Sequence, residues 1–518
     1  MNSVRAKILN FFIYYLSYRS RMVAQPPTLT TCPAWALFVL ASLGASNCTV
    51  GPNYRKTEPS TPAKWNRLEA TASPVADASA RGDLGQWWRR LNDPVLSQLV
   101  EDAQRQSLDL RKAEARLRET RARLGIATAG RYPSVGASAS ASRSGSVGPS
   151  VSPSAGDGAT AGGAGNQFNA GFDASWELDV FGGVRRSVEA AQADQQSAVA
   201  GLDDARVSLV AEVARGYVEV RSLQSRLDIA RTNLASQSET LELTDLRARA
   251  GLVSAQDAEQ ARSNREQTLA QIPSLTISLA EAEHRLDILL GKAPGTLHTR
   301  LSIAGGLPEI PPRVAVGIPA DTLRQRPDVR MAERKLAAET ARVGVAEAAR
   351  YPALKLSGSI GLESLSQGTT GSGTGASYSL LGGITAPIFN ARRLKNQVEA
   401  QDAVREQAQV AYEQAVLTAL QDVENALVAL ARNRERSEAL FRAAEAAREA
   451  AQLARQRYGA GVIDFQSVID TERTVLSVED SLASSRADGV LALIRLYKAL
   501  GGGWSQEAES HAADNGAS

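Results

Sequence analysis

Asp470 and Arg473 are the two side chains whose types and spacing are best suited to electrostatic chemistry. They lie three residues apart in AGVIDFQSVIDTERT, shortly after a glycine-containing turn at residues 459–461. In a helix, residues at this spacing lie on one face about one turn apart, so the carboxylate and the guanidinium can interact. Taken alone, they form an ordinary ion pair on a helix surface, worth roughly a few tenths of a kcal/mol.

Side chains suited to catalysis or metal binding are otherwise scarce. The chain has three histidines, His284, His298 and His511, and two cysteines, Cys32 and Cys48. No Gly-x-Ser-x-Gly stretch or phosphate-binding loop follows a predicted buried strand. We therefore expect no enzyme activity, no cofactor and no metal. The 58 Lys and Arg residues nearly balance 56 Asp and Glu residues, which excludes the basic surface that nucleic-acid binding needs.

The first 47 residues predict a signal peptide. The apolar run AWALFVLASL, residues 34–43, is too short to span a bilayer as a helix, and small residues lead from it to Cys48. This order resembles a lipoprotein signal, after which Cys48 becomes the acylated first residue of the mature chain. One alternative stays open for each end of this segment. At its end, Cys48 would be an ordinary small residue of a signal peptide and carry no lipid. At its beginning, Met22 would be the true start.

The chain contains two copies of one unit. ARLGIATAGRYPSV, residues 122–135, matches ARVGVAEAARYPAL, residues 341–354, in the order of its Ala-Arg, Gly, Ala and Arg-Tyr-Pro positions. Further on, Phe181 corresponds to Phe389. An internal duplication of about two hundred residues therefore organises the sequence.

Each copy carries stretches with the period-two pattern of strands. In NQFNAGFDASWELDV, residues 166–180, every even position from Phe168 onward is apolar. Phe168, Phe172 and Trp176 then lie on one face, opposite acidic side chains. A tilted strand of about 14 residues covers about 33 Å, close to the hydrocarbon thickness of a bilayer, so we expect this face to contact lipid. A soluble sandwich shows the same alternation but needs more than the four strands predicted here.

A long helical hairpin is predicted after each pair of strands. Residues 392–457 contain no Gly or Pro, and their apolar residues recur at spacings of three and four, the seam of a coiled coil. Such a helix is about 100 Å long. Pro273 predicts a kink or break in the returning helix of the first copy.

These patterns divide the chain into segments that differ in composition and period. They are a signal peptide at 1–47, a lipid-anchored extended segment at 48–93, a first repeat at 94–291 (helix, strand hairpin 132–180, helical hairpin 183–291), a Pro/Gly-rich connector at 292–318, a second repeat at 319–504 (helix, strand hairpin 352–388, helical hairpin 391–503) and a disordered tail at 505–518.

Four strands cannot close a barrel. An open sheet edge in lipid leaves unpaired backbone groups, each costing several kcal/mol, so strands of other copies must complete the ring. The protein is therefore expected to be an oligomer. The spacing does not choose between two, three and four chains.

At this point the motifs resemble those of the TolC-like outer-membrane efflux proteins, specifically their lipoprotein branch. The resemblance covers residues 48–504, with the motifs in the family's order. They are CTVGPNYRKTEPSTPAKW, GQWWRRLNDPVLSQLV, ARYP or its variant GRYP in the two copies, LDVFGGVRR, GIPADTLRQRPDVRMAE, APIFN and LYKALGGGW.

The resemblance implies a mainly α fold with membrane β: a homotrimer whose 12-stranded outer-membrane β-barrel continues into a 12-helix periplasmic α-barrel. It makes the connector at 292–318 part of an equatorial belt around that α-barrel. It implies an exit duct that works with a periplasmic adaptor (membrane fusion) protein and an inner-membrane transporter of RND type to export drugs or toxic small molecules. It places Asp470 and Arg473 at a periplasmic gate and Cys48 at the lipid anchor. Two alternatives stay open, an exit channel for type I protein secretion and a non-channel periplasmic coiled-coil scaffold or adaptor.

Overall fold

The computed structural model describes residues 49–56, 62–65, 76–77, 84–145, 165–303, 305–311, 314–316, 319–367 and 372–504. The expected signal peptide, Cys48 and the expected tail lie outside these residues. The described residues belong to one compact unit. None of the helices in the described ranges has a stretch apolar enough to cross a bilayer.

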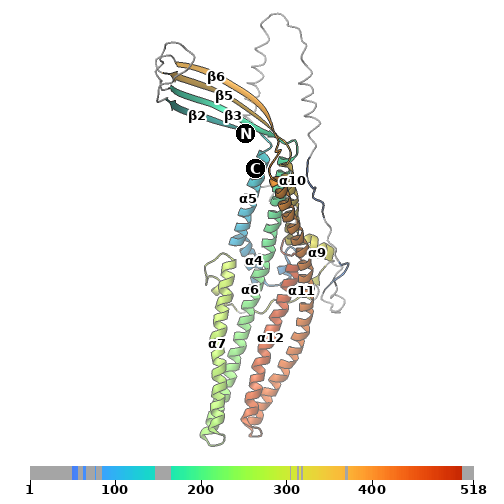
Figure 1. Cartoon of the computed structure of the whole chain (residues 1–518). Helices are drawn as coiled ribbons and strands as arrows, with labels where there is room; N and C mark the ends of the chain where they lie inside the picture. Colours follow the sequence, from blue (N-terminus) through green and yellow to red (C-terminus); the bar gives the residue numbers. More distant parts are fainter. Residues whose placement is uncertain are drawn as a thin grey trace, which may run out of the picture. The chain divides into compact units, whose positions relative to one another are not determined.

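Four strands form one antiparallel sheet in the order β2, β3, β5, β6 (Figure 1). The two hairpins, one from each repeat, are joined through β3 and β5, where Phe172 pairs with Ile360. β3 keeps the period-two pattern from Phe168 onward, whereas the adjacent Leu380 and Leu381 interrupt it in β6. The strands are β2 (Ser134–Ser144), β3 (Gly165–Leu178), β5 (Ala353–Gln367) and β6 (Ser372–Thr385).

One face of this sheet is apolar across all four strands. Cross-strand partners share a face, so the register places Phe172 beside Ile360 and Tyr378, and Trp176 beside Leu356. The other face pairs polar side chains, including an ion pair between Lys355 and Glu177 at 3.7 Å. The larger apolar side chains are exposed in the single chain, among them Phe172 at 60% and Tyr378 at 88%.

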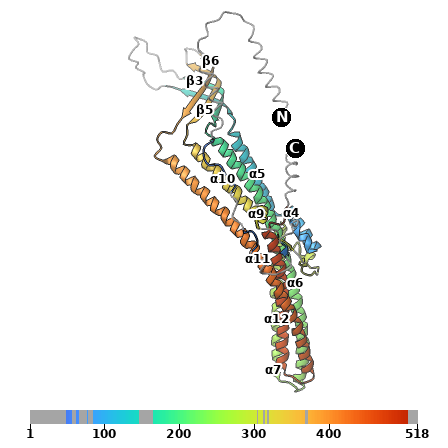
Figure 2. The same ribbon diagram turned by 90° about the vertical axis from the view of Figure 1, so that its right-hand side faces the viewer.

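Two helical hairpins make up most of the remaining structure. α6 (Gly183–Arg249) turns back as α7 (Ala255–Leu289), and α11 (Arg393–Gly459) turns back as α12 (Phe465–Ala499). α6 and α12 also contact each other, so the two hairpins lie side by side (Figure 2). Their buried residues recur at three- and four-residue spacings because a period near 3.5 keeps one stripe of each helix against its neighbour.

The expected break at Pro273 is wrong. α7 runs as one helix from Ala255 to Leu289 with Pro273 inside it. Proline removes one N–H donor from the helical ladder, and in a 35-residue helix packed along α6 the flanking turns hold the backbone together.

Shorter elements flank the long helices where the two repeats meet. α5 and α10 connect directly to the sheet, and α10 packs between α6 and α11. Strand β1 pairs in parallel with β4, which joins the N-terminal segment to the connector. These elements are β1 (Ala76–Asp77), the 3-10 helix η1 (Trp87–Leu91), α4 (Pro94–Gln106), α5 (Leu108–Ala129), α8 (His298–Leu301), β4 (Val314–Ala315), α9 (Pro319–Gln325) and α10 (Pro327–Ala348).

The largest hydrophobic core lies where these shorter elements pack on the long helices. Its contacts explain several of the sequence motifs. Trp87 stacks on Tyr497 with ring centroids 5.0 Å apart. A Cβ on Gly502 would lie 2.9 Å from the Trp87 ring, so only glycine fits there. Asp93 caps α4 by accepting from Leu96 N, and its second oxygen accepts from the Tyr217 hydroxyl at 2.7 Å. Burial, together with this bond to the Asp93 carboxylate, raises the pKa of Tyr217 to about 12.

Candidate functional site

The candidate site is the tip, by which we mean the turns at residues 250–254 and 460–464 with the adjoining ends of α6, α7, α11 and α12. Both turns reverse the chain through a glycine in the left-handed region, Gly251 at φ 74° and Gly461 at φ 75°. Side-chain caps then start the returning helices. The Ser254 hydroxyl accepts from Asp257 N, and Asp464 accepts from Ser467 N at 3.1 Å.

A small apolar cluster holds the two hairpins together at the tip. Tyr458 at the end of α11 packs against Phe465 at the start of α12, with ring centroids 5.4 Å apart. Ala261 contributes from α7, and Leu241 packs on the cluster from α6. All four helix ends therefore share one core, whose remaining buried members are Ala454, Val468 and Ile469.

Arg247 adds a polar link between the hairpins. This side chain near the end of α6 donates to the carbonyl oxygens of Tyr458 at 2.7 Å and Gly459 at 2.6 Å. The guanidinium also lies 4.7 Å from the centroid of the Tyr458 ring. A cation at the C-terminus of a helix satisfies carbonyls that have no partner within the helix, so Arg247 caps α11 from another hairpin.

The structure places Asp470 and Arg473 on the first turns of α12, both exposed. Within the chain they do not pair with each other. Asp470 accepts from Gln466 Nε2 at 2.9 Å, whereas Arg473 Nε donates to Asn264 Oδ1 on α7 at 3.0 Å. The carboxylate of Asp470 therefore stays open to other charged groups, and Arg473 ties α12 to α7.

Above the tip, the contact between α6 and α12 is polar. Asn233 donates to Glu479 at 3.0 Å, and Thr240 donates to Glu472 at 2.6 Å. Glu472 is only 5% exposed, and this burial raises the pKa of its carboxyl group, against the opposing effects of Thr240 and Arg455. Apolar side chains hold the same seam of α6 together nearer the sheet. The tip half is thus the less hydrophobic half of this contact.

One side chain of this seam lacks partners. Gln237 is 2% exposed, and neither its amide oxygen nor its amide nitrogen has a hydrogen-bond partner in the part of the chain that the structure describes. Buried amides without partners destabilise the arrangement that buries them. The unpaired amide of Gln237 therefore destabilises the α6–α12 contact next to the tip.

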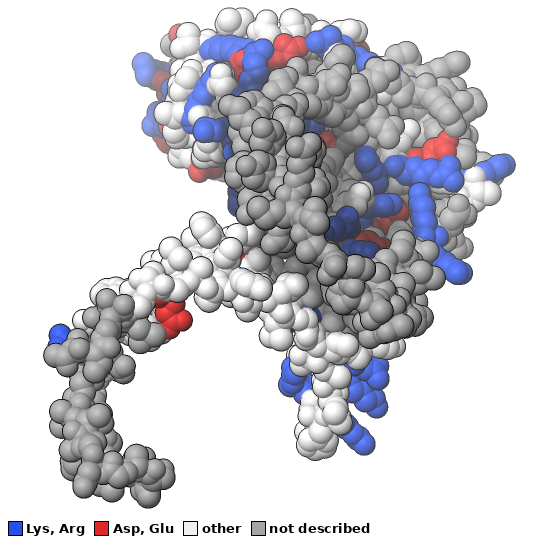
Figure 3. All heavy atoms as spheres, turned by 90° about the horizontal axis from the view of Figure 1, so that it is seen from above, with Lys and Arg blue, Asp and Glu red and all other residues white. Residues whose placement is uncertain are grey.

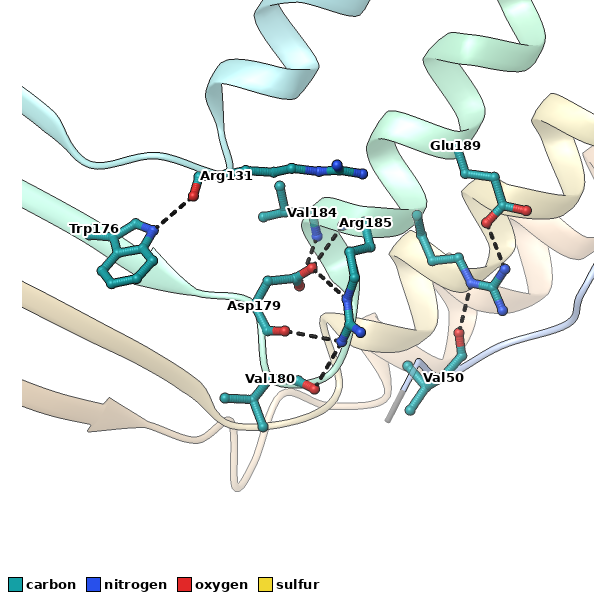
Figure 4. Close-up of polar contacts among 9 residues, drawn as sticks. Val50, Arg131, Trp176, Asp179, Val180, Val184, Arg185 and Glu189 are labelled. Atoms are coloured by element: carbon teal, nitrogen blue, oxygen red, sulfur yellow. Dashed lines mark hydrogen bonds and ion pairs between the residues drawn. The ribbon is translucent and has the colours of Figure 1, made fainter. Parts of the chain in front are cut away.

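A second polar centre lies at the junction, by which we mean the places where strands meet helices near residues 130–133, 179–183, 350–352 and 386–392. Asp179, just after β3, accepts from the backbone N–H groups of Val184 and Arg185 at 3.0 and 2.8 Å (Figure 4). Arg185 also turns its side chain back to Asp179 at 3.2 Å. The start of α6 is thereby fixed to the end of the strand.

Arg186, at the same junction, binds the N-terminal segment through hydrogen bonds. It is 3% exposed and donates to the carbonyls of Val50 and Gly51 at 3.2 and 3.1 Å and to Asn53 Oδ1 at 2.6 Å. Figure 4 labels Val50 and Glu189, which both accept hydrogen bonds from Arg186. The segment that follows Cys48 is therefore bound next to the sheet.

The sequence did not single out Arg247, Glu472 or Arg186. The sequence does contain a signal for Arg247, because this residue lies four positions before the turn glycine Gly251. A side chain in the last turn of a helix can reach the end of a neighbouring helix. Glu472 and Arg186 stand in charged helical stretches like many others. Within the described residues no group of three or more His, Cys, Asp and Glu side chains could hold a metal.

The chain is similar to known proteins over most of its length. The family described as Outer membrane efflux protein matches residues 99–292 and 318–502. Nodulation protein T of Rhizobium leguminosarum bv. trifolii is 33% identical over 476 residues, which cover 90% of this chain and 97% of that relative. The pyoverdine export outer membrane protein OpmQ of Pseudomonas putida is 32% identical over 461 residues, which cover 86% and 93%.

Solved structures share the fold. The structure of the outer-membrane channel OprN is similar with a TM-score of 0.79 and 36% identity, covering 88% of this chain and 100% of that one. The Campylobacter jejuni CmeC outer membrane channel gives a TM-score of 0.80 at 23% identity, covering 91% and 98%. The mainly helical arrangement with a small set of strands is therefore that of solved outer-membrane channels.

Proposed function

Because the chain belongs to the outer membrane efflux protein family, we propose that it forms the exit channel of a tripartite efflux pump. The observation that carries this proposal is the sheet. It has an exposed apolar face, and its outer strands β2 and β6 have no further strand beside them among the described residues. Such a sheet is stable in a membrane only when other strands pair with its edges.

The proposed assembly is a homotrimer. Three copies of the four-stranded sheet make a 12-stranded barrel, with Phe168, Phe172 and Trp176 facing lipid. The hairpins α6–α7 and α11–α12 of three copies then continue it as a 12-helix cylinder in the periplasm. The polar face of the sheet, which carries Glu177 and Lys355, lines the water-filled interior.

The proposed cargo is a drug or another toxic small molecule. The name of the Pseudomonas putida relative, a pyoverdine export protein, supports a small-molecule class for this chain as well. We propose that the channel conducts passively and that a periplasmic adaptor and an inner-membrane transporter of RND type deliver the cargo. Selectivity then rests with the transporter.

The tip is the proposed gate. Three copies of Asp470 around the channel axis would concentrate cations, and Arg473 would help to hold the tip closed. The exposed carboxylate of Asp470 and the bond from Arg473 to α7 support these roles. Opening would require the hairpins to separate at the tip.

The proposed lipid anchor is Cys48. Arg186 binds the segment that begins at Thr49 beside the sheet, which supports a position of the acyl chains close to the barrel. Acylation adds about 0.8 kcal/mol per buried methylene, while the barrel itself already holds the protein in the membrane. A Cys48→Ala variant with a cleavable signal should still insert and form trimers, and failure to form trimers would contradict an accessory role.

The test of the channel is reconstitution. Purified protein should run as a heat-modifiable trimer from outer-membrane fractions and should produce single-channel conductance in planar bilayers. A water-soluble chain without conductance would instead support a periplasmic scaffold. A type I secretion channel would also conduct, and the pump whose deletion abolishes export through this channel separates it from an efflux duct.

A further inference from the structure

The junction repeats one combination of side chains at four places. Each passage between strand and helix carries an aromatic residue within a few positions of an arginine, and the two repeats contribute two passages each. The pattern includes the Arg-Tyr-Pro motif that marks the duplication. The four combinations are Arg131 with Tyr132, Phe181 with Arg185, Arg350 with Tyr351, and Phe389 with Arg392.

The aromatic side chains lie at the edge of the apolar sheet face. Tyr132 is 67% exposed and Phe389 90% exposed. Tyr351 stacks on Phe181 with centroids 4.8 Å apart, which joins the two repeats. Trp176 belongs to the same level, because its indole N–H donates to the Arg131 carbonyl at 3.1 Å (Figure 4). Tyr and Trp favour the boundary between hydrocarbon and water, so this row sits at that boundary if the sheet spans a membrane.

Three of the four arginines have no partner in the described part of the chain. The guanidinium groups of Arg131, Arg350 and Arg392 are exposed and make no hydrogen bond or ion pair to any residue that the structure describes. The fourth, Arg185, is held by Asp179. The second repeat has no carboxylate equivalent to Asp179, because the residues that precede α11 read APIFN.

Two of the carboxylates around the junction already pair with other basic side chains. Glu189 pairs with Arg186 at 2.7 Å, and Glu177 pairs with Lys355. Glu347, one turn before Arg350 on α10, makes no ion pair with it. Viewed from the sheet end, the arm of strands is almost free of charge, whereas Lys and Arg side chains, with Asp and Glu among them, lie on the adjacent helical part (Figure 3). Among the described residues the three unpaired guanidinium groups outnumber the unpaired carboxylate of Glu347, so the charge next to the apolar face is net positive.

We propose that Arg131, Arg350 and Arg392 bind the phosphate groups of anionic phospholipids in the leaflet next to the helices. This inference rests on the proposed membrane barrel. The planar guanidinium matches a phosphate with two parallel N–H bonds, and its position just beyond the aromatic row is the depth of the headgroups. The lipid contact fixes how deep the barrel sits and makes it selective for anionic lipid.

The test measures bound lipid on the purified full-length oligomer. Detergent-solubilised protein is incubated with equal amounts of phosphatidylglycerol and phosphatidylcholine of the same acyl chains, and retained lipid is counted by native mass spectrometry. The wild type should retain phosphatidylglycerol in excess, with each arginine contributing a factor of about five. An Arg131→Gln, Arg350→Gln, Arg392→Gln variant should retain both lipids equally.

The matched control changes three exposed arginines away from the sheet, Arg111→Gln, Arg442→Gln and Arg457→Gln, and should keep the preference. A variant with lysine at the three junction positions keeps the charge without the planar fork and should show an intermediate preference. Equal retention of both lipids by a conducting wild type would overturn this inference alone. A wild type that never inserts into any bilayer would overturn the proposed channel and this inference with it.

Discussion

The guanidinium of Arg247 lies over the ring of Tyr458 while donating to the carbonyl oxygen of the same residue. A single side chain near the end of α6 thus recognises both the side chain and the backbone at the end of α11. The two residues belong to different repeats, so the contact joins the hairpins at the point where the proposed channel must open. In the proposed channel, opening would separate these two residues.

Replacing Arg247→Ala should loosen the tip. Two hydrogen bonds from a charged group would be lost, at a cost of about 2 kcal/mol to the local contact. We expect faster amide hydrogen exchange at residues 459–464 and a larger closed-state conductance. Arg249→Ala is the control, because among the described residues Arg249 pairs only with Asp245, on its own helix. Unchanged exchange in the Arg247→Ala protein would show that the apolar cluster alone holds the tip.

The contact between Glu472 and Thr240 should depend on pH. Burial raises the pKa of Glu472 above its ordinary 4.5, so folding favours the protonated form. The corresponding stability is present in full below pH 4.5 and is lost as the pH rises through the folded pKa. Glu472→Gln should therefore melt at a higher temperature than the wild type at neutral pH.

The melting temperatures of Glu472→Gln and the wild type should converge in acid, where both side chains are neutral. Glu242→Gln, on the exposed face of α6, is the matched control. A constant difference in melting temperature at every pH would mean that the substitution acts through packing and not through ionisation.

The bond between Arg473 and Asn264 predicts how the proposed gate responds to mutation. Arg473→Ala and Asn264→Ala each break the same link between α12 and α7, so each should raise the closed-state conductance by a similar amount. The double variant should add little to either one, because partners in one bond are not additive. Asp470→Ala should instead lower the preference for cations. A closed-state current that none of these changes alters would count against the gate.

Arg186 should hold the N-terminal segment in place. Arg186→Ala leaves several backbone and side-chain acceptors without a donor, and we expect a loss of about 3 kcal/mol in stability. Residues 49–56 should become accessible to protease. Gly344→Ala should act in the same direction, because its Cβ would lie 2.9 Å from the Arg186 side chain.

Arg215→Ala, which removes an exposed ion pair to Glu212 on the same helix, is the comparison for Arg186→Ala. An equal protease sensitivity of the Arg186→Ala and Arg215→Ala proteins would refute the docking role of Arg186.

The family and the types of the elements were accessible from the sequence alone. The alternation from Phe168 to Trp176 appears in β3, and the run without Gly or Pro appears in α11. The spacing of apolar residues follows from the geometry of a single strand or helix, so it can be recognised from residues that are close together in the sequence. The duplication is visible for the same reason, because it compares one stretch of sequence with another.

Only the tertiary structure decided which groups meet. The pairing of β3 with β5, the stacking of Trp87 on Tyr497 and the capping of α11 by Arg247 each join residues about two hundred or more positions apart. The same holds at Pro273, where local sequence predicted a kink or break and the packed helix runs without a break. Contacts of this kind depend on how whole helices pack, and a helix surface offers many charged side chains of which packing selects a few.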